Sequence, residues 1–350
     1  NFFRFIMEKN LIYIDKNLGI PLMGIDFLGL IDRGTNVIEL KPLTLCNLKC
    51  KYCFVSSNDY KTNFIINSDF LLDKVKRLIE FKGEYDIEVH LAPYGEILLY
   101  PELESLLEQL SNLKGIKTIS MQSNGLLLSD TIIKMLKETR LTRINISLNT
   151  LNEELACKLC NCKNYDLKTL LKNIYILLDS EIDVLLAPVW FPGENDSDIE
   201  DIIKLVIKLR KEGYQDEHIK IGIQKYLIYK TGRKLKKVRP KSWNYFYSQL
   251  TKLERKYKLK LKLGPFDFGI HKRPTFSPIN LKRRDLVEIE IVSKGRWQNE
   301  CIGKINDDLG IKLLLKKPLT YNEQLKGKYL TAKIIKANYK ENIITALYPF

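Results

Sequence analysis

The sequence CNLKCKYC at residues 46–53 holds three cysteines, Cys46, Cys50 and Cys53, in a C-x3-C-x2-C spacing. It follows a short apolar run at 36–41, which predicts a buried strand, so the cysteines stand in the loop at the carboxyl end of that strand. Around the loop, residues 35–228 alternate between short apolar runs and helical periodicities, the pattern of repeated βα units. Strands are predicted at 36–41, 86–92, 117–122, 143–148, 183–189 and 220–226, and helices at 69–82, 102–113, 130–139, 167–180 and 196–212. The alternation predicts an α/β fold, either an open barrel or a doubly wound sheet, with its chemistry at the carboxyl ends of the strands.

Three closely spaced thiols suit few kinds of site. A structural zinc site needs a fourth ligand and is usually built from C-x2-C pairs, and disulfide frameworks are rare in the cytoplasm. Thiolates hold iron-sulfur clusters, and three of them leave one iron of a four-iron cluster without a protein ligand. We therefore expect Cys46, Cys50 and Cys53 to bind a 4Fe-4S cluster whose open iron can bind a substrate. A structural zinc site or an incidental grouping of cysteines is the alternative.

The spacing, with the aromatic Tyr52 before the last cysteine, resembles the motif of radical S-adenosylmethionine (SAM) enzymes. The resemblance covers over half of the chain and implies a partial (β/α)6 barrel, for which residues 35–228 supply the strands. It also implies that the open iron chelates the amino and carboxylate groups of SAM. An electron from the cluster then cleaves SAM to a 5'-deoxyadenosyl radical, which abstracts hydrogen from the substrate. A reducing electron donor is an implied partner.

Polar residues after later strands match positions where this family binds SAM. The segment Tyr94-Gly95-Glu96 resembles the family's Gly-Gly-Glu-Pro motif, which implies that Gly95 and Glu96 take the SAM ammonium. Here Tyr94 and Ile97 replace the first Gly and the Pro. The resemblance implies contacts to the SAM carboxylate and ribose from Ser123 and Asn124 after the third strand and from Ser147 and Asn149 after the fourth. It also implies that residues 188–192 and 224–226, including Gln224, flank the adenine. These are also ordinary strand-end residues, which is the alternative interpretation.

Four cysteines stand outside the loop. Cys157, Cys160 and Cys162 form C-x2-C-x-C at a predicted helix start, compact enough to bind a second cluster or another metal. Because no fourth ligand stands nearby in the sequence, free thiols are the alternative. Cys301 is expected in a strand of the core, with a covalent methyl-carrier role as the alternative.

Positive charge is concentrated in one segment. The whole chain has 57 Lys and Arg against 42 Asp and Glu, a net charge of +15 that favours a polyanionic partner. Between Lys230 and Arg284 stand eighteen basic residues and two acidic ones, a net of +16. The aromatic residues interleaved with this segment or just before it are Tyr226, Tyr229, Trp243, Tyr245, Phe246, Tyr247 and Tyr257. The combination predicts phosphate contacts together with base stacking, with a solvated lysine-rich helix as the alternative.

The last part of the chain is β-rich. Segments at 287–292, 311–315, 330–335 and 343–347, separated by Gly and Pro turns, predict a small closed all-β barrel. The sequence VEIEIVSKGRWQNECIGKI at 287–305, the turn at Asp307-Asp308 and Gly327 before LTAKIIKA resemble the TRAM domain, an OB-like RNA-binding barrel. The predicted organisation is an N-terminal extension at 1–34, a radical SAM barrel at 35–228, a basic and partly helical linker at 229–282 and a TRAM-like barrel at 283–350. This arrangement resembles an archaeal group of radical SAM proteins.

Composition excludes other classes of protein. Hydrophobic residues make up 45% and charged residues 28%, proportions that exclude disorder and collagen. No run approaches the roughly 18 apolar residues of a membrane-spanning helix, and residues 1–17 lack the apolar core of a secretory signal. A cytoplasmic location without membrane partners is therefore predicted. Because the chain begins at Asn1, either residues have been lost or Met7 is the start.

These features predict a radical SAM enzyme that modifies a nucleoside of RNA, most plausibly tRNA. In this interpretation the basic segment and the C-terminal tail bind phosphates, while the radical SAM barrel supplies the radical chemistry. A radical SAM enzyme acting on a protein or small molecule is the first alternative. A non-catalytic RNA-binding protein with a structural cluster is the second.

Overall fold

The computed structural model describes residues 10–276, 280–338 and 341–350, so the alternative start at Met7 lies outside the described residues. The chain divides into two compact units. Unit 1 comprises Asn1–Leu45, Asp59–Lys117 and His271–Phe350, and unit 2 comprises Cys46–Asn58 and Thr118–Ile270. The four-part division expected from the sequence stays a prediction. Among the described residues, no helix has both the length and the apolar character that crossing a membrane requires.

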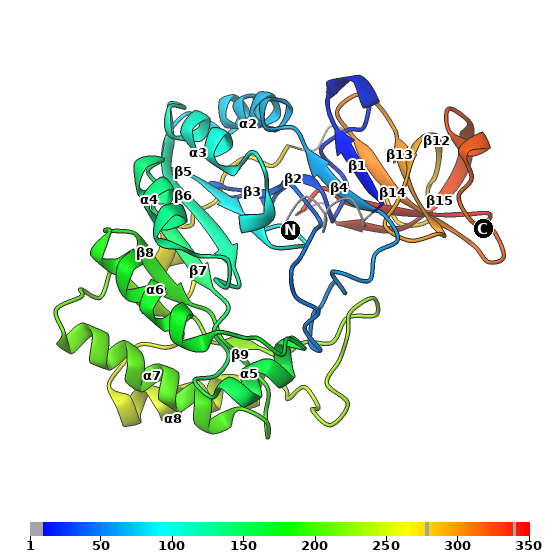
Figure 1. Cartoon of the computed structure of the whole chain (residues 1–350). Helices are drawn as coiled ribbons and strands as arrows, with labels where there is room; N and C mark the ends of the chain where they lie inside the picture. The colour runs from blue at the N-terminus through cyan, green and yellow to red at the C-terminus, as the bar shows by residue number, and fades with distance from the viewer. Residues whose placement is uncertain (1–9, 277–279, 339–340) are drawn as a thin grey trace. The chain divides into compact units, whose positions relative to one another are not determined.

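One seven-stranded sheet carries the predicted βα units, in the order β10-β8-β7-β6-β5-β3-β2 (Figure 1). Its strands are β2 (Gly29–Asp32), β3 (Val37–Lys41), β5 (Ile87–Leu91), β6 (Ile116–Ser123), β7 (Arg143–Ile146), β8 (Asp183–Leu186) and β10 (Ile219–Ile221). Strands β6, β7, β8 and β10 are parallel to one another, and β3 is parallel to β5. Strand β2, at the edge of the sheet, runs antiparallel to β3. The α/β partial barrel expected from the sequence is confirmed.

Two of the predicted strands are each divided in the structure. The run at 183–189 forms β8 and then β9 (Val189–Trp190), and the run at 220–226 forms β10 and then β11 (Gln224–Lys225). The second parts leave the main sheet and pair with each other in parallel, Gln224 opposite Val189. Pro188 precedes β9 and Gly222 precedes β11, and both residue types interrupt a regular ladder. The segments expected near adenine therefore lie side by side.

Helices of unit 2 lie along its strands. Figure 1 shows α4 (Asp130–Glu138), α6 (Leu167–Asp179) and α7 (Asp196–Lys211) beside β6, β7 and β8. Unit 2 also contains α5 (Glu153–Cys160) and α8 (Trp243–Tyr257). Each amphipathic helix buries its apolar stripe, as α7 does with Ile202, Ile203 and Val206. The apolar faces of the helices thus cover the sheet and leave its strand ends for polar side chains.

Unit 1 combines part of the sheet with the C-terminal barrel. A second pair of strands, β1 (Leu11–Ile14) and β4 (Asn63–Ile66), is parallel, and the helices are α2 (Ser68–Lys82) and α3 (Leu103–Ser111). Helix α2 begins at its cap Asn67, whose side chain accepts a hydrogen bond from the Phe70 N–H at 3.0 Å. At its other end the buried Lys82 ammonium pairs with Asp32 of β2 at 2.6 Å. Helix α2 is therefore joined to the edge of the sheet by a buried ion pair.

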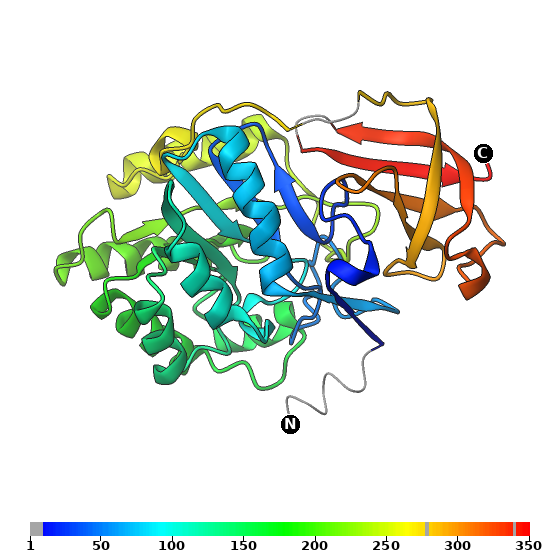
Figure 2. The ribbon, with the colours of Figure 1, turned by 90° about the horizontal axis from the view of Figure 1, so that it is seen from above.

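The five C-terminal strands close into a barrel in the order β12-β13-β14-β16-β15, which confirms the small all-β barrel (Figure 2). They are β12 (Leu286–Lys294), β13 (Glu300–Lys304), β14 (Gly310–Leu315), β15 (Tyr329–Asn338) and β16 (Ile343–Tyr348). Strand β13 adds to the four predicted segments. Its Cys301 is fully buried among Ile289, Ile311 and Leu313, as expected of a core residue.

Within unit 1, the barrel packs against the segment at residues 23–27. The Gly310 N–H donates to the Met23 carbonyl at 2.7 Å, and a Cβ on Gly24 would lie 2.0 Å from the Gly310 oxygen. Only glycine tolerates this approach. The Arg296 guanidinium lies 4.1 Å from the Phe27 ring centroid, close enough for a cation–π contact. The barrel is therefore integrated into the core of unit 1.

Candidate active site

The cysteine loop, residues 46–58, is a series of tight turns after β3. The Cys53 N–H donates to the Cys50 carbonyl at 3.2 Å, and the Ser56 N–H donates to the Cys53 carbonyl at 3.4 Å. The Leu48 N–H donates to Cys46 Sγ at 3.5 Å. All three cysteines are partly exposed. The loop thus turns sharply enough to bring three thiols to one short stretch of surface.

The donor chemistry of this loop fits an iron-sulfur cluster. Three thiols and partial exposure suit a cluster with one open iron. In the described part of the chain, no three His, Cys, Asp or Glu side chains converge as ligands of a bound metal do. The thiol side chains must therefore turn toward one another when a cluster binds, over a backbone that already places them close in the chain.

Two predicted SAM contacts hold the cysteine loop in place. Asn124, after β6, donates through Nδ2 to the side-chain oxygen of Asn47 at 2.8 Å. Asn149, after β7, donates through Nδ2 to the Tyr52 hydroxyl at 2.6 Å and accepts from the Val189 N–H at 2.7 Å. Both side chains therefore connect strand ends to the loop, and their contacts with SAM stay predictions.

The two predicted serines take part in hydrogen bonds at the same edge of the sheet. Ser123 is buried, and its hydroxyl accepts from the Gly125 N–H at 2.9 Å, which shapes the turn after β6. The Ser147 hydroxyl accepts from Gln122 Nε2 at 2.9 Å. The Ser147 N–H also donates to the Ser123 carbonyl at 3.0 Å. The structure thus brings the ends of β6 and β7 together, as expected for parallel strands.

Arg233 is a site residue that sequence reasoning missed, because it was counted only as one of many basic residues. Its guanidinium donates through Nε to the Cys50 carbonyl at 2.7 Å and through a terminal nitrogen to the Ser57 carbonyl at 3.0 Å. Its backbone N–H donates to the Cys53 carbonyl at 2.8 Å. Beside it, a Cβ on Gly232 would lie 2.6 Å from the Phe54 oxygen. Neither spacing nor periodicity signals such a clamp, although the Gly-Arg pair marks a close backbone approach.

Gly95 and Glu96 of unit 1 pack against the residue that precedes Cys46. The Glu96 N–H donates to the Leu45 carbonyl at 2.7 Å, and a Cβ on Gly95 would lie 2.0 Å from that same oxygen. Glu96 is 2% exposed, and its carboxylate accepts from the Leu98 N–H at 3.1 Å. A glycine is therefore required at position 95 for steric reasons, and the carboxylate is held at the start of the short helix η2 (Ile97–Leu99).

A buried ion pair lies beside this turn. Lys41, at the end of β3, pairs with Glu39, donates to the Ala92 carbonyl at 2.9 Å and lies 4.6 Å from the Tyr94 ring centroid. Arg33 also bonds Glu39, at 2.7 Å. Burial alone would raise the pKa of Glu39, but the Lys41 and Arg33 charges outweigh it and lower the pKa to about 2. Tyr94, which replaces the first Gly of the family motif, therefore packs on a fixed cation.

The second cysteine group lies at the end of a helix, which corrects the sequence expectation of a helix start. Asn152 caps α5 by accepting from the Leu155 N–H at 2.9 Å, and Asn161 ends the helix in a left-handed conformation. Cys157 and Cys160 therefore lie in its last turn, and Cys162 follows it. Contact with the buried Cys160 thiol, together with burial, raises the pKa of the Cys50 thiol.

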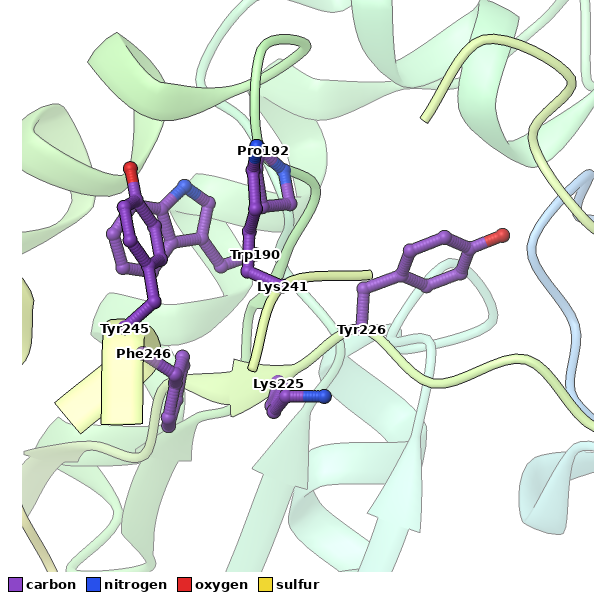
Figure 3. Close-up of a pocket in the computed structure, with 7 residues that line it drawn as sticks. All are labelled: Trp190, Pro192, Lys225, Tyr226, Lys241, Tyr245 and Phe246. Atoms are coloured by element: carbon purple, nitrogen blue, oxygen red, sulfur yellow. The ribbon is translucent and has the colours of Figure 1, made fainter. Parts of the chain in front are cut away.

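The segments expected at adenine meet around a small pocket (Figure 3). Figure 3 shows Trp190, Tyr245 and Phe246 gathered together, with Tyr226 pointing away from them. The pocket has a volume of only about 10 Å³, far below the roughly 300–1,000 Å³ of typical ligand sites. It is therefore an apolar joint between β9, β11 and α8. The side chain of Gln224 on β11 is exposed, and its contact with adenine stays a prediction.

Several known proteins are similar to this chain in sequence or in fold. The uncharacterized protein MJ0103 of Methanocaldococcus jannaschii is 33% identical over 361 residues, covering 97% of this chain and 81% of that protein. GTP 3',8-cyclase of Aquifex aeolicus is 28% identical over 191 residues, and this match spans 53% of the chain and only 58% of the cyclase. A solved structure of spore photoproduct lyase has a TM-score of 0.52 at 10% identity, covering 71% of this chain and 78% of that one, which shows a shared fold alone.

The family model described as the radical SAM superfamily matches residues 40–206. That range holds the cysteine loop, the turn at Gly95 and Glu96 and the polar ends of β6 and β7. Together with the relative that matches nearly the whole chain, it shows that the chain belongs to the radical SAM superfamily.

Proposed function

We infer that the enzyme uses a 4Fe-4S cluster and SAM as cofactors, as membership of this superfamily implies. The thiols that would hold the cluster are Cys46, Cys50 and Cys53, and a bound cluster supplies the electron that cleaves SAM. The chain's own residues fix the loop that carries these thiols. Arg233 bonds its carbonyls, and Asn124 and Asn149 bond Asn47 and Tyr52. The buried Glu96 carboxylate is the group that would accept the SAM ammonium.

We propose that this enzyme modifies a nucleoside within RNA, with tRNA as the expected RNA. The observation that supports the proposal is the place of the basic segment. Arg233 and Thr231 both bond the cysteine loop, the latter by accepting from the Ser56 hydroxyl at 2.7 Å. The exposed cations Lys234, Lys236 and Lys237 follow within a few residues of this clamp. Phosphates bound there would hold an RNA chain next to the loop that carries the cluster.

The C-terminal barrel is part of the same proposal. We propose that it is a TRAM-like domain and that exposed basic residues at its start, Lys282, Arg283 and Arg284, add phosphate contacts. Their contribution would be electrostatic and independent of base sequence.

A purine nucleotide is the small-molecule substrate that the relatives favour, because several curated relatives are named GTP 3',8-cyclase. Each of those matches covers about half of this chain. RNA and GTP share the nucleotide unit but differ in the number of phosphates and in length. Competition between them therefore separates the two candidates.

The experiment is anaerobic reconstitution of the full chain with iron and sulfide, followed by reduction with dithionite in the presence of SAM. We expect release of 5'-deoxyadenosine, stimulated by RNA from a strain lacking the protein and by GTP only weakly. Mass spectrometry of nucleosides from that strain should then show one modified nucleoside missing. Stimulation by GTP alone, with no nucleoside missing, would replace RNA by a nucleotide as the substrate.

A further inference from the structure

Exposed aromatic side chains border the basic loop, which we define as residues 230–241. Tyr229 precedes it and Trp243 follows it, and their side chains are 49% and 50% exposed. Single exposed aromatics are common on protein surfaces, whereas exposed aromatics that lie close together form an apolar patch that marks a candidate binding surface. All of these residues belong to unit 2.

The basic loop is fixed by its apolar residues, which leaves its charges outward. Val238 is buried with Leu159, Phe191 and Tyr226, and Leu235 packs on the same small core. The Leu235 N–H donates to the Tyr226 hydroxyl at 3.0 Å. Between and beside these anchors the exposed residues are Lys234, Lys236, Lys237 and Arg239. The loop therefore presents a row of cations on an ordered backbone.

Two exposed rings at the start of α8 form a stacked pair. Trp243 and Tyr247 have ring centroids 5.8 Å apart and planes 24° apart, and Tyr247 is 49% exposed. Spacing of four residues on a helix places both side chains on one face. Between them in the chain, Phe246 is buried, and its ring centroid lies 6.0 Å from that of Trp190. This packing anchors the first turns of α8. The Lys225 ammonium lies 4.9 Å from the Trp243 ring centroid.

A second exposed aromatic pair lies on the cysteine loop itself. Phe54, directly after Cys53, has its ring centroid 5.8 Å from that of Tyr229, and its side chain is 50% exposed. The basic loop thus begins beside one aromatic pair and ends beside another. This combination of cations and half-exposed rings is the chemistry by which proteins bind single-stranded nucleic acid.

We propose that a single-stranded RNA segment binds along the basic loop, with bases stacked on Trp243 and Tyr247 and on Phe54 and Tyr229. The phosphates lie against the exposed cations between the two pairs. This inference rests on the proposed function and names the form of RNA that the enzyme takes. Single-stranded RNA fits because its unstacked bases can reach exposed rings, whereas paired bases present only edges and backbone.

The test measures binding of a short fluorescein-labelled oligouridine to the full chain by anisotropy, at several salt concentrations. A Trp243→Ala, Tyr247→Ala double variant should lose about tenfold or more in affinity, since each stacked base is worth roughly 1–3 kcal/mol, while the salt dependence stays unchanged. Trp243→Phe should retain most of the affinity. Phe266→Ala is the matched control, because Phe266 is 94% exposed in the same unit.

A second variant tests the cations. Changing Lys234, Lys236, Lys237 and Arg239 to Gln should flatten the slope of log affinity against log salt by about 0.7 per lost phosphate contact. Changing the exposed Lys134, Lys137, Lys168 and Lys172 of α4 and α6 to Gln is the charge-matched control.

The outcomes separate this inference from the proposed function. If the wild type binds RNA and the double variant binds as tightly as Phe266→Ala, the stacking surface is wrong and the RNA proposal stands. If the wild type binds double-stranded RNA more tightly than oligouridine, the inference is also wrong. If the wild type binds neither oligouridine nor double-stranded RNA, or binds an acidic peptide more tightly than either, both proposals fail.

Discussion

Arg233→Ala should loosen the cysteine loop while leaving its cysteines in place. The substitution removes two guanidinium hydrogen bonds, to the Cys50 and Ser57 carbonyls, at 2.7 and 3.0 Å. A hydrogen bond from a charged donor contributes about 1.5–3 kcal/mol, and Arg233 is partly exposed, which reduces that value. We therefore expect a loss of about 2–4 kcal/mol in the free energy that holds the loop. The backbone bond from Arg233 to Cys53 remains.

The assay is the rate at which reconstituted protein loses iron to an excess of chelator under anaerobic conditions. Because about 1.4 kcal/mol corresponds to a factor of ten, the variant should lose iron at least about tenfold faster than the wild type. Arg239→Ala removes the same charge from an exposed position in the same loop and should not change the rate. Arg233→Lys, which can restore one of the two bonds, should fall between them.

Equal rates for Arg233→Ala and Arg239→Ala would refute the clamp. The thermal unfolding midpoint of each cluster-free protein separates a local effect from general destabilisation. A clamp predicts a small change in the midpoint and a large change in iron loss, whereas a general loss of stability would change both together.

Three further predictions concern the cysteine loop, Glu96 and Glu39. Changing Cys46, Cys50 and Cys53 together to Ala should abolish iron binding and 5'-deoxyadenosine release. An iron content near four atoms per wild-type chain would mean that the second cysteine group binds no cluster. Glu96→Ala should weaken SAM binding by about 1.5–3 kcal/mol in equilibrium dialysis with the cluster retained, and unchanged affinity would assign the ammonium contact to another residue. The pKa of Glu39 is lowered from 4.5 to about 2, so its ionised form stabilises the fold by on the order of 3 kcal/mol. This stabilisation is complete above pH 4.5 and is lost as the pH falls toward 2. Glu39→Gln should therefore make the free energy of unfolding less dependent on pH over that window.

The fold could be predicted from the sequence because its signals are local. Apolar runs and helical periodicity predicted the main strands within a few residues, as at β7 (Arg143–Ile146). Cysteine spacing predicted the loop after β3. Helix α5 was missed because it is short and its boundaries depend on capping by Asn152 and on the left-handed Asn161. Strand β2 (Gly29–Asp32) was missed because it is only four residues long and its strand character depends on its antiparallel pairing with β3, which a pattern within the segment itself does not reveal.

The sequence predicted candidate site residues but not the contacts that hold them in place. Glu96 and Asn149 were chosen because they follow strands and match positions where the family binds SAM, and their contacts with SAM stay predictions. Their hydrogen bonds to Leu98 and to Tyr52 and Val189 depend on turns that no spacing encodes. Arg233 looked like one more charge in a basic segment. Its role follows from hydrogen bonds to the Cys50, Ser57 and Cys53 carbonyls, which become visible only in the folded chain.

If the proposed function is right, we expect the C-terminal barrel to contribute less to RNA recognition than its resemblance to the TRAM domain alone would imply. OB-like barrels bind oligonucleotides with the face of their second and third strands and with the loop between the first and second. Here β14, the third strand of the barrel, packs on residues 23–27, where the Gly310 N–H donates to the Met23 carbonyl and Lys312 pairs with Asp26. In the loop between β12 and β13, Trp297 contacts Tyr60, with ring centroids 5.3 Å apart. This face is therefore already engaged within unit 1, and deleting the barrel would uncover the buried Phe27. Charge substitutions, rather than truncation, are the perturbation that can assign RNA binding to either unit.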